Sequence, residues 1–297
     1  MPSLGIETSC DDTAVGIVTS SRAILSDCIH LQSHLHEPKG GIVLTLAMVS
    51  HRKNLPTVIR DVVEEARVDV LRDVDIIAVT IGPGLGPCLG VGVDAAKSLA
   101  CVLRKPIIGF HHMEAHALTL RLLNPLLSFP YLTLLISGGH TLMLLTRHVN
   151  SHTILSTTVG DSISEAFDKV TRLLNIPWLP GRSGGLALHS DAMLLLDKFQ
   201  LQHLTGLKTA VKYLIEEEKL DVEDEEVRRD LAAVFQYVAV EHLIGTSNKL
   251  ATEDDIELFF PPPELCADNG VMIAWAGIKL TVTFLNKIPK WPIDILR

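Results

Sequence analysis

The residues best suited to chemistry are two histidines in the segment His112-Met113-Glu114-Ala115-His116. In a helix, positions i and i+4 lie on one face with their Cβ atoms about 5–6 Å apart. Two imidazoles at this spacing can hold one metal ion, although two ligands alone are too few for a metal site. Glu114 points away from that face, so the segment lacks the base of the H-E-x-x-H protease pattern. The alternative is an ordinary helix with two polar histidines.

A third, anionic ligand is available much further along the chain. Asp268 lies in the string Cys266-Ala267-Asp268-Asn269-Gly270, between three prolines and an apolar helix. Its carboxylate could complete a metal site with the two histidines. It could equally cap the helix that follows. The sequence leaves both roles open.

Two polar strand-to-strand turns could approach a ligand. Residues 9–13 include Asp11 and Asp12, which could hold a metal while the backbone N–H groups bind a phosphate. The alternative is a polar turn in which aspartate bonds its own backbone. The second turn has small residues where a backbone could approach a ligand closely. It comprises Ile136, Ser137, Gly138, Gly139 and His140.

Two glycine-rich loops are weaker signals. Residues 82–92 follow a strand and open a helix, where anions are favoured. This loop fits neither the P-loop nor the dinucleotide pattern, and a tight packing corner is the alternative. Gly184 and Gly185, preceded by Pro180-Gly181, form a second flexible loop.

Strands and helices alternate in two similar series, which predicts an α/β fold. The expected strands are residues 4–8, 14–19, 23–30, 74–81, 106–110, 131–136, 141–146, 154–158 and 256–260. The expected helices are residues 42–68, 91–103, 163–174, 207–218, 225–243 and 271–278. We expect duplicated domains over residues 1–110 and 111–297 with a cleft between them. The alternative is one mixed α/β domain.

Composition excludes several classes of protein. The 297 residues are 47% hydrophobic, which excludes a disordered chain. The net charge of −9 argues against a protein that binds nucleic acid through bulk charge. Any RNA contact therefore needs a local basic patch. The candidates are Arg52-Lys53, Arg104-Lys105, Lys169 with Arg172, and Lys208 with Lys212.

The five cysteines are scattered and form no C-x-x-C pair, as is typical of a reducing compartment. No apolar run reaches the roughly 18 residues of a membrane span, so no membrane association is expected. No targeting leader is visible at the start of the chain.

Together, seven strings resemble one family, the tRNA N-6-adenosine threonylcarbamoyltransferases. They are GIETSCDDTA, GPGLGPCLGVG, HHMEAHALT, LLISGGHTL, EAFDKV, TGLKTAV and FFPPPELCADNGVMIAWAG. The match runs from Leu4 to about Gly277. It implies the actin / sugar kinase / heat-shock-70 fold, with duplicated actin-like (ribonuclease-H-like) domains and a central cleft. It also implies transfer of a threonylcarbamoyl group from threonylcarbamoyl-AMP to the exocyclic amine of adenosine 37 in tRNAs reading codons that begin with A.

The resemblance also implies roles for residues, although it assigns no catalytic residue. His112, His116 and Asp268 would bind one divalent metal ion, zinc or iron, as a Lewis acid. Residues 136–140 would line the phosphate and carbamoyl region of the donor. The remaining implied contacts are Asp168 with the ribose, Gly184 and Gly185 with the nucleoside, Asp11 and Asp12 near the phosphates, and Lys208 with donor or tRNA.

One departure from the family pattern bears on activity. The family carries a strand, a glycine-rich loop and a helix before FFPPPE, and here only residues 244–248 remain as a relic of the loop, with Asn248 as its asparagine. This loss would expose a sheet edge and apolar surface. The alternatives to a transferase are a non-catalytic nucleotide-binding member of the fold and a small-molecule kinase or ATPase.

The motif flanks resemble one branch of the family. His111 before the histidine pair and the string ALTLRL after it are most similar to the mitochondrial, bacterial-type members. This implies a mitochondrial location, with the cytoplasm as the alternative. The expected partners are tRNA and threonylcarbamoyl-AMP, with a homodimer left open.

Overall fold

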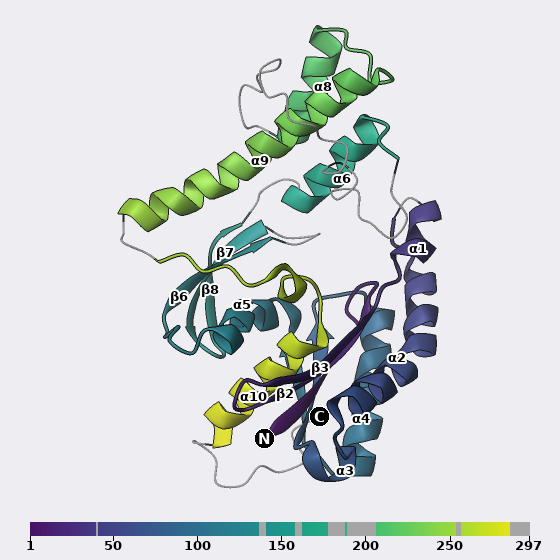
Figure 1. Ribbon diagram of the computed structural model, residues 1–297, viewed down its shortest axis with the longest axis vertical. Helices are drawn as coiled ribbons and strands as arrows, with labels where there is room; N and C mark the ends of the chain where they lie inside the picture. The colour runs from purple at the N-terminus through teal and green to yellow at the C-terminus, as the bar shows by residue number, and fades with distance from the viewer. Residues whose placement is uncertain are drawn as a thin grey trace. The chain divides into compact units, whose positions relative to one another are not determined.

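The structure is a computed structural model that describes residues 1–39, 41–136, 141–157, 162–177, 188, 206–253 and 257–285. Packing divides the chain into two compact units (Figure 1). The first unit comprises Met1–Thr133, Leu144–Thr153 and Phe260–Arg297, and the second comprises Leu134–Met143 and Ile154–Phe259. The predicted boundary between duplicated domains, at residue 110, stays a prediction, because these units describe packing and not a repeat.

A five-stranded mixed sheet, in the order β3-β2-β1-β4-β5, forms the centre of the first unit. β1 pairs antiparallel with β2 and parallel with β4, and Ile6 lies opposite both Val15 and Val79. The parallel pair β4–β5 and the antiparallel pair β2–β3 complete the sheet. The strands are β1 (Pro2–Glu7), β2 (Thr13–Thr19), β3 (Ile24–His30), β4 (Ile76–Gly82) and β5 (Ile107–His111).

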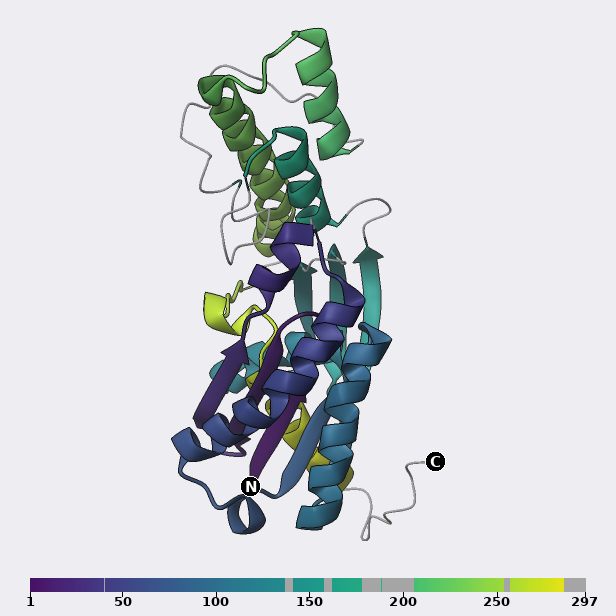
Figure 2. The same cartoon turned by 90° about the vertical axis from the view of Figure 1, so that its right-hand side faces the viewer.

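Helices cover both faces of this sheet, as the continuous apolar run of β4 predicts (Figures 1 and 2). Alternate residues of a strand point to opposite faces, so Val79 packs with α2 and α4 while Ala78 packs with α10. The helices are α2 (Leu44–Ala66), α4 (Gly86–Leu103), α5 (His112–Leu123) and α10 (Gly270–Leu285), with short turns α1 (Ser33–His36), η1 (Glu37–Lys39) and α3 (Val70–Asp73).

α4 is the one helix of the described residues that is long and apolar enough to cross a membrane. Its residues Ala96 and Ala100 are buried in the core cluster beneath the sheet, together with Val58 and Val62 of α2. One face of the helix is therefore part of the core, while most of its residues are not buried. It begins at Gly86, earlier than the predicted start at Val91, because the second half of the glycine-rich loop is already helical.

A second sheet has the order β6-β7-β8. Its strands follow one another in space as in sequence, like β1, β2 and β3, and this supports a duplicated architecture. In the second unit, α6, α8 and α9 pack around Val170, Leu231 and Phe235. These elements are β6 (Tyr131–Ile136), β7 (Thr141–His148), β8 (Ser151–Thr157), α6 (Ile163–Leu173), α8 (Leu207–Glu217) and α9 (Glu225–Glu253).

Two expectations for the region before the prolines are wrong. The described residues 257–260 form no strand, and the chain passes into the short helix η2 (Pro263–Leu265). Prolines lack the N–H that a strand ladder needs, so they favour an end to pairing here. The chain from 244 to 248 continues α9, so Asn248 lies in a helix and not in a relic of the family loop. Phe260 is 82% exposed, as expected where a covering element is missing.

Candidate metal centre

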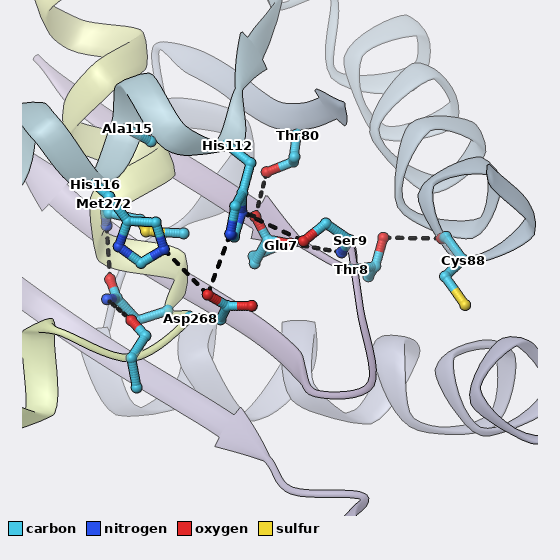
Figure 3. A network of polar contacts seen from close by, with 12 residues as sticks. Glu7, Thr8, Ser9, Thr80, Cys88, His112, Ala115, His116, Asp268 and Met272 are labelled. Atoms are coloured by element: carbon cyan, nitrogen blue, oxygen red, sulfur yellow. Dashed lines mark hydrogen bonds and ion pairs between the residues drawn. The ribbon is translucent and has the colours of Figure 1, made fainter. Parts of the chain in front are cut away.

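The predicted helix carries both histidines to one place. β5 runs directly into α5, so His112 is the first residue of α5 and His116 follows one turn later. Their ring centroids lie 4.7 Å apart with the ring planes at 84° (Figure 3). His112 is buried, and both side chains face the same side of α5. The i, i+4 geometry is therefore confirmed.

Asp268 joins the two histidines from 152 residues beyond His116. Its Oδ1 lies 3.3 Å from His112 Nε2 and 3.1 Å from His116 Nε2. One ligand atom from each residue lies within 4.8 Å of the other two. Two imidazole nitrogens and a carboxylate oxygen at this spacing fit a divalent cation such as zinc or iron.

The alternative role of Asp268, as the cap of α10, is wrong. Asn269 takes that role, because its Oδ1 accepts a hydrogen bond of 2.7 Å from the backbone N–H of Met272. Its Nδ2 also donates to the Ala267 carbonyl, which ties down the preceding turn. Asp268 is thereby left to face the histidines.

Close packing of α10 on the sheet fixes the position of Asp268, which lies just before this helix. A Cβ added at Gly270 would overlap the backbone of Val15 and Gly16, and one at Gly5 would overlap the backbone of Ala274. The helix axis can approach β1 and β2 this closely because these positions have no side chain. The two glycines thus bring the distant Asp268 motif against the sheet that carries α5.

A buried carboxylate behind the site orients His112. Glu7, at the end of β1, is fully buried, and its Oε2 lies 3.0 Å from His112 Nδ1 (Figure 3). Its oxygens also accept hydrogen bonds from the Ser9 backbone N–H and the Thr80 hydroxyl. A histidine held through Nδ1 presents Nε2 to a metal. Sequence reasoning missed Glu7, although a lone carboxylate ending an apolar strand was a usable signal.

Electrostatic coupling holds the three residues together. Burial lowers the pKa of His112, but hydrogen bonds to Asp268 and Glu7 and their charges outweigh it and raise the pKa to about 10. Burial likewise raises the pKa of Asp268, and its hydrogen bonds to His112 and His116 pull it below its usual range. The site therefore favours positive charge beside Asp268.

The Asp11–Asp12 turn lies close enough to Asp268 for the Asp268 charge to affect the pKa values of residues in the turn. Burial and the Asp11 charge raise the pKa of Asp12 to about 6, against a hydrogen bond that its Oδ1 accepts from the Gln32 N–H at 2.9 Å. Burial, Asp11 and Asp268 raise the pKa of the Cys10 thiol, which stays protonated. A role for Asp11 and Asp12 near phosphates stays a prediction.

The glycine-rich loop packs against the same turn. Gly84 has no room for a Cβ beside Ser9, and the Leu85 N–H donates to the Ser9 carbonyl at 2.7 Å. The Thr8 hydroxyl reaches the Cys88 carbonyl at the start of α4. These contacts support the packing-corner interpretation of residues 82–92.

The remaining predicted residues are distributed differently. Ile136 ends β6 and is 45% exposed, Asp168 lies on α6, and Lys208 lies on α8. Residues 137–140, 180–181, Gly184 and Gly185 lie outside the described residues. The structure therefore brings together the metal set and leaves the donor contacts untested.

Comparison with known proteins identifies the family. Residues 23–275 match the family described as TsaD: tRNA N6-adenosine threonylcarbamoyltransferase. A probable mitochondrial enzyme of that name from Arabidopsis thaliana is 38% identical, over 93% of this chain and 68% of its own length. The mitochondrial enzyme of Xenopus tropicalis is 34% identical, over 93% of this chain and 82% of its own length.

A bacterial relative shows that segments are missing here. The enzyme of Sphingopyxis alaskensis is 35% identical over 98% of this chain and 95% of its own length. That alignment spans 338 residues, more than the 297 of this chain, so the relative carries segments that this chain lacks.

A solved structure shows the fold. The Acidaminococcus fermentans (R)-2-hydroxyglutaryl-CoA dehydratase component A superposes with a TM-score of 0.51 at 11% identity, over 95% of this chain and 99% of that one. This likeness confirms the predicted α/β fold class. With the histidine–aspartate site and the sequence relatives in agreement, the chain belongs to the tRNA N6-adenosine threonylcarbamoyltransferase family.

Proposed function

We propose that this chain transfers the threonylcarbamoyl group from threonylcarbamoyl-AMP to the exocyclic amine of adenosine 37 in tRNAs reading codons that begin with A. The observation that carries the proposal is the convergence of His112, His116 and Asp268 on one point. The names of the curated relatives support tRNA as the acceptor.

In the reaction the adenosine amine displaces AMP from the donor and loses a proton. The lone pair of the adenosine amine attacks the carbamoyl carbon, a C–N bond forms, and the C–O bond to the adenylate phosphate breaks. The bonding electrons leave with AMP, and the amine gives up a proton to a base that the described residues do not identify. A zinc or iron ion held by His112, His116 and Asp268 would polarise the carbamoyl oxygen and stabilise charge there.

The chain's own residues prepare this site. Glu7 holds His112 Nδ1, so that Nε2 stays directed at Asp268. Asn269 caps α10 and keeps the Asp268 carboxylate available. Both residues are fully buried, so these orientations are set before any substrate binds.

The donor contacts are part of the proposal and rest on the family resemblance. Residues 136–140 would line the phosphate and carbamoyl region, Asp168 would bind the ribose, and Gly184 with Gly185 would contact the nucleoside. Asp11 and Asp12 would lie near the phosphates. The absence of membrane association is a further expectation, and a homodimer is left open.

A mitochondrial location is also proposed. The named mitochondrial relatives from a plant and a frog support it, whereas bacterial relatives of similar identity carry no information on location. Cell fractionation of the endogenous protein with an antibody would test the location. A signal only in the cytosolic fraction would contradict it.

The transfer assay tests the activity. Purified protein is incubated with tRNA transcript, threonylcarbamoyl-AMP and zinc or iron, and the digested nucleosides are measured by mass spectrometry. Threonylcarbamoyladenosine supports the proposal. Donor binding in calorimetry without product, while a full-length relative is active in parallel, would indicate a non-catalytic member of the fold. ATP hydrolysis that survives His112→Ala with His116→Ala would indicate a kinase or ATPase.

A further inference from the structure

Two cations lie over one buried tryptophan in the first unit, and a third residue, Arg121, is hydrogen-bonded to one of them through its backbone. Lys279 Nζ lies 3.9 Å from the ring centroid of Trp275, and the Arg22 guanidinium lies 5.6 Å from it. Arg22 also donates a hydrogen bond of 2.9 Å to the backbone carbonyl of Arg121. We call Arg22, Arg121 and Lys279 the cation cluster. Its members come from the β2–β3 turn, α5 and α10, and are all partly exposed.

The surrounding contacts fix where these side chains point. Arg121 stacks over Phe129 with 3.9 Å between guanidinium and ring centroid, and its Nε donates to the Leu127 carbonyl. The Trp275 indole N–H donates to the Leu118 carbonyl, which locks the ring between α5 and α10. An arginine whose guanidinium face stacks on a ring still has N–H groups at its edge that can donate to an anion such as phosphate.

Among the described residues, the cation cluster lacks the counter-charge that several other cations have. Lys169 pairs with Glu165 at 2.8 Å and Lys212 with Glu216 at 3.6 Å, so two of the basic patches expected from the sequence are partly neutralised. Within the ranges that the structure describes, no carboxylate forms an ion pair with any member of the cation cluster. In a chain of net charge −9 this makes the cluster a local exception.

Burial and the charges of its two neighbours lower the pKa of Lys279. Burial lowers its pKa first, and the charges of Arg22 and Arg121 lower it further, to about 8. Like charges held a few ångströms apart disfavour the charged form of a lysine. An anion placed among them would remove that cost, so the arrangement favours anion binding.

We propose that the cation cluster binds a phosphate group of an RNA backbone. Two guanidinium forks and an ammonium are the groups that proteins use for phosphate contacts, which position a nucleic acid without reading its sequence. Arg121 follows His112 by nine positions on α5, a rise of about 13 Å along the helix axis. Nine positions are also about two and a half turns, so Arg121 lies on the opposite side of α5 from His112, and an RNA that contacts both must follow the surface around the helix. The RNA is tRNA if the proposed function holds, so the inference rests on that function for the ligand's identity.

The first experiment compares two double variants with the same change in charge. Arg121→Gln with Lys279→Gln removes two members of the cluster, and Arg60→Gln with Arg72→Gln removes two exposed arginines that pair with their own helix neighbours. Affinity for tRNA transcript is measured over a series of salt concentrations. The cluster variant should bind tRNA about tenfold more weakly, and its log–log salt slope should be shallower by about 1 for each cation removed.

The control double variant should keep both the wild-type affinity and the wild-type slope. Equal behaviour of the two double variants would overturn the proposal. Circular dichroism and bound-metal content establish that the cluster variant is folded. Because binding is measured without the donor, a chain that binds tRNA through the cluster but transfers nothing would remove the proposed function and leave the cluster in place.

The second experiment needs no charge-removing variant. Lysines are reductively methylated with ¹³C-formaldehyde, and Lys279 is assigned by its loss in Lys279→Arg. Its titration midpoint should rise when tRNA is added and also with inorganic phosphate, compared with chloride at equal ionic strength. A rise with phosphate alone would contradict an RNA ligand. An unchanged midpoint with both would overturn the site altogether.

Discussion

Glu7 Oε2 lies 3.0 Å from His112 Nδ1, so a fully buried carboxylate at the end of β1 orients the histidine that begins α5. This relationship joins the first strand of the chain to the metal site. The Thr80 hydroxyl and the Ser9 N–H donate to the same carboxylate, which fixes its position in turn. The candidate metal ligand His112 is thus supported by a network that spans β1, β4 and α5 (Figure 3).

Substitution of Glu7 should weaken metal binding without removing a ligand. Glu7→Gln removes the charge that holds the His112 ring, and losses of this kind usually cost 10–100-fold in metal affinity. We expect at least a tenfold weaker affinity for zinc, measured by competition with a chromogenic chelator. The matched control is Glu114→Gln, which lies on α5 two residues from His112 and forms no ion pair in the described part of the chain. Equal affinities in the two variants would refute the role of Glu7.

Removal of the α10 cap should destabilise the protein. Asn269→Ala loses the hydrogen bond to the Met272 N–H and should lower the free energy of unfolding by about 1 kcal/mol. Asn269→Ser should retain most of that stability, since serine is a good cap. Urea unfolding followed by circular dichroism measures both. If alanine is as stable as serine at this position, Asn269 is not the cap.

A methyl group at Gly270 should destabilise the protein, because α10 packs directly against the sheet at this position. Gly270→Ala would push the helix away from the backbone of Val15 and Gly16, at a cost of about 1–3 kcal/mol or more, and displace Asp268. Gly90→Ala, on α4 with open space around its Cα, should be neutral or slightly stabilising. Thermal unfolding and bound metal are measured for both. Wild-type metal content in Gly270→Ala would contradict this packing argument.

Stability should fall as the pH rises from about 4 to 7, in part through Asp27. Burial raises the pKa of Asp27 to about 6, against hydrogen bonds from the Gly270 and Val271 N–H groups. The folded state therefore holds a proton that the unfolded state, with a pKa of about 3.9, has released, and folding loses free energy across this window.

In Asp27→Asn, the loss in free energy of unfolding between about pH 4 and 7, measured by urea unfolding, should be smaller by about 1–3 kcal/mol. Part of the fall should remain in this variant, because the pKa of Asp12 is raised to about 6 as well. The control Asp61→Asn, at a surface carboxylate that pairs with Arg60, should leave the dependence unchanged. A pH profile of Asp27→Asn that equals the wild type would contradict the assignment.

The sequence alone was sufficient to predict that two histidines share one helix face. The i, i+4 spacing of His112 and His116 depends only on helix geometry, and the structure has that helix. Asp268 needed the family resemblance, because the local sequence fits a helix cap equally well. Only the structure separates the two roles, by placing the cap on Asn269.

The rest depends on contacts between distant segments. Glu7 meets His112 across 105 positions, and Arg22 meets Arg121 across 99, so no local pattern predicts either pair. The expected strand at 256–260 came from the residue pattern before the prolines, and the loop around Asn248 came from the family pattern. Where the chain departs from that pattern, α9 continues to Glu253, although Gly245, Thr246 and Asn248 are poor helix formers.

The most direct test of the account is the yield of threonylcarbamoyladenosine as metal is added back to chelator-treated protein, with tRNA and threonylcarbamoyl-AMP in excess. The account predicts no product without metal, a yield that saturates at one ion per chain, and no recovery in Asp268→Asn. Full yield in the chelated protein or in Asp268→Asn would contradict it.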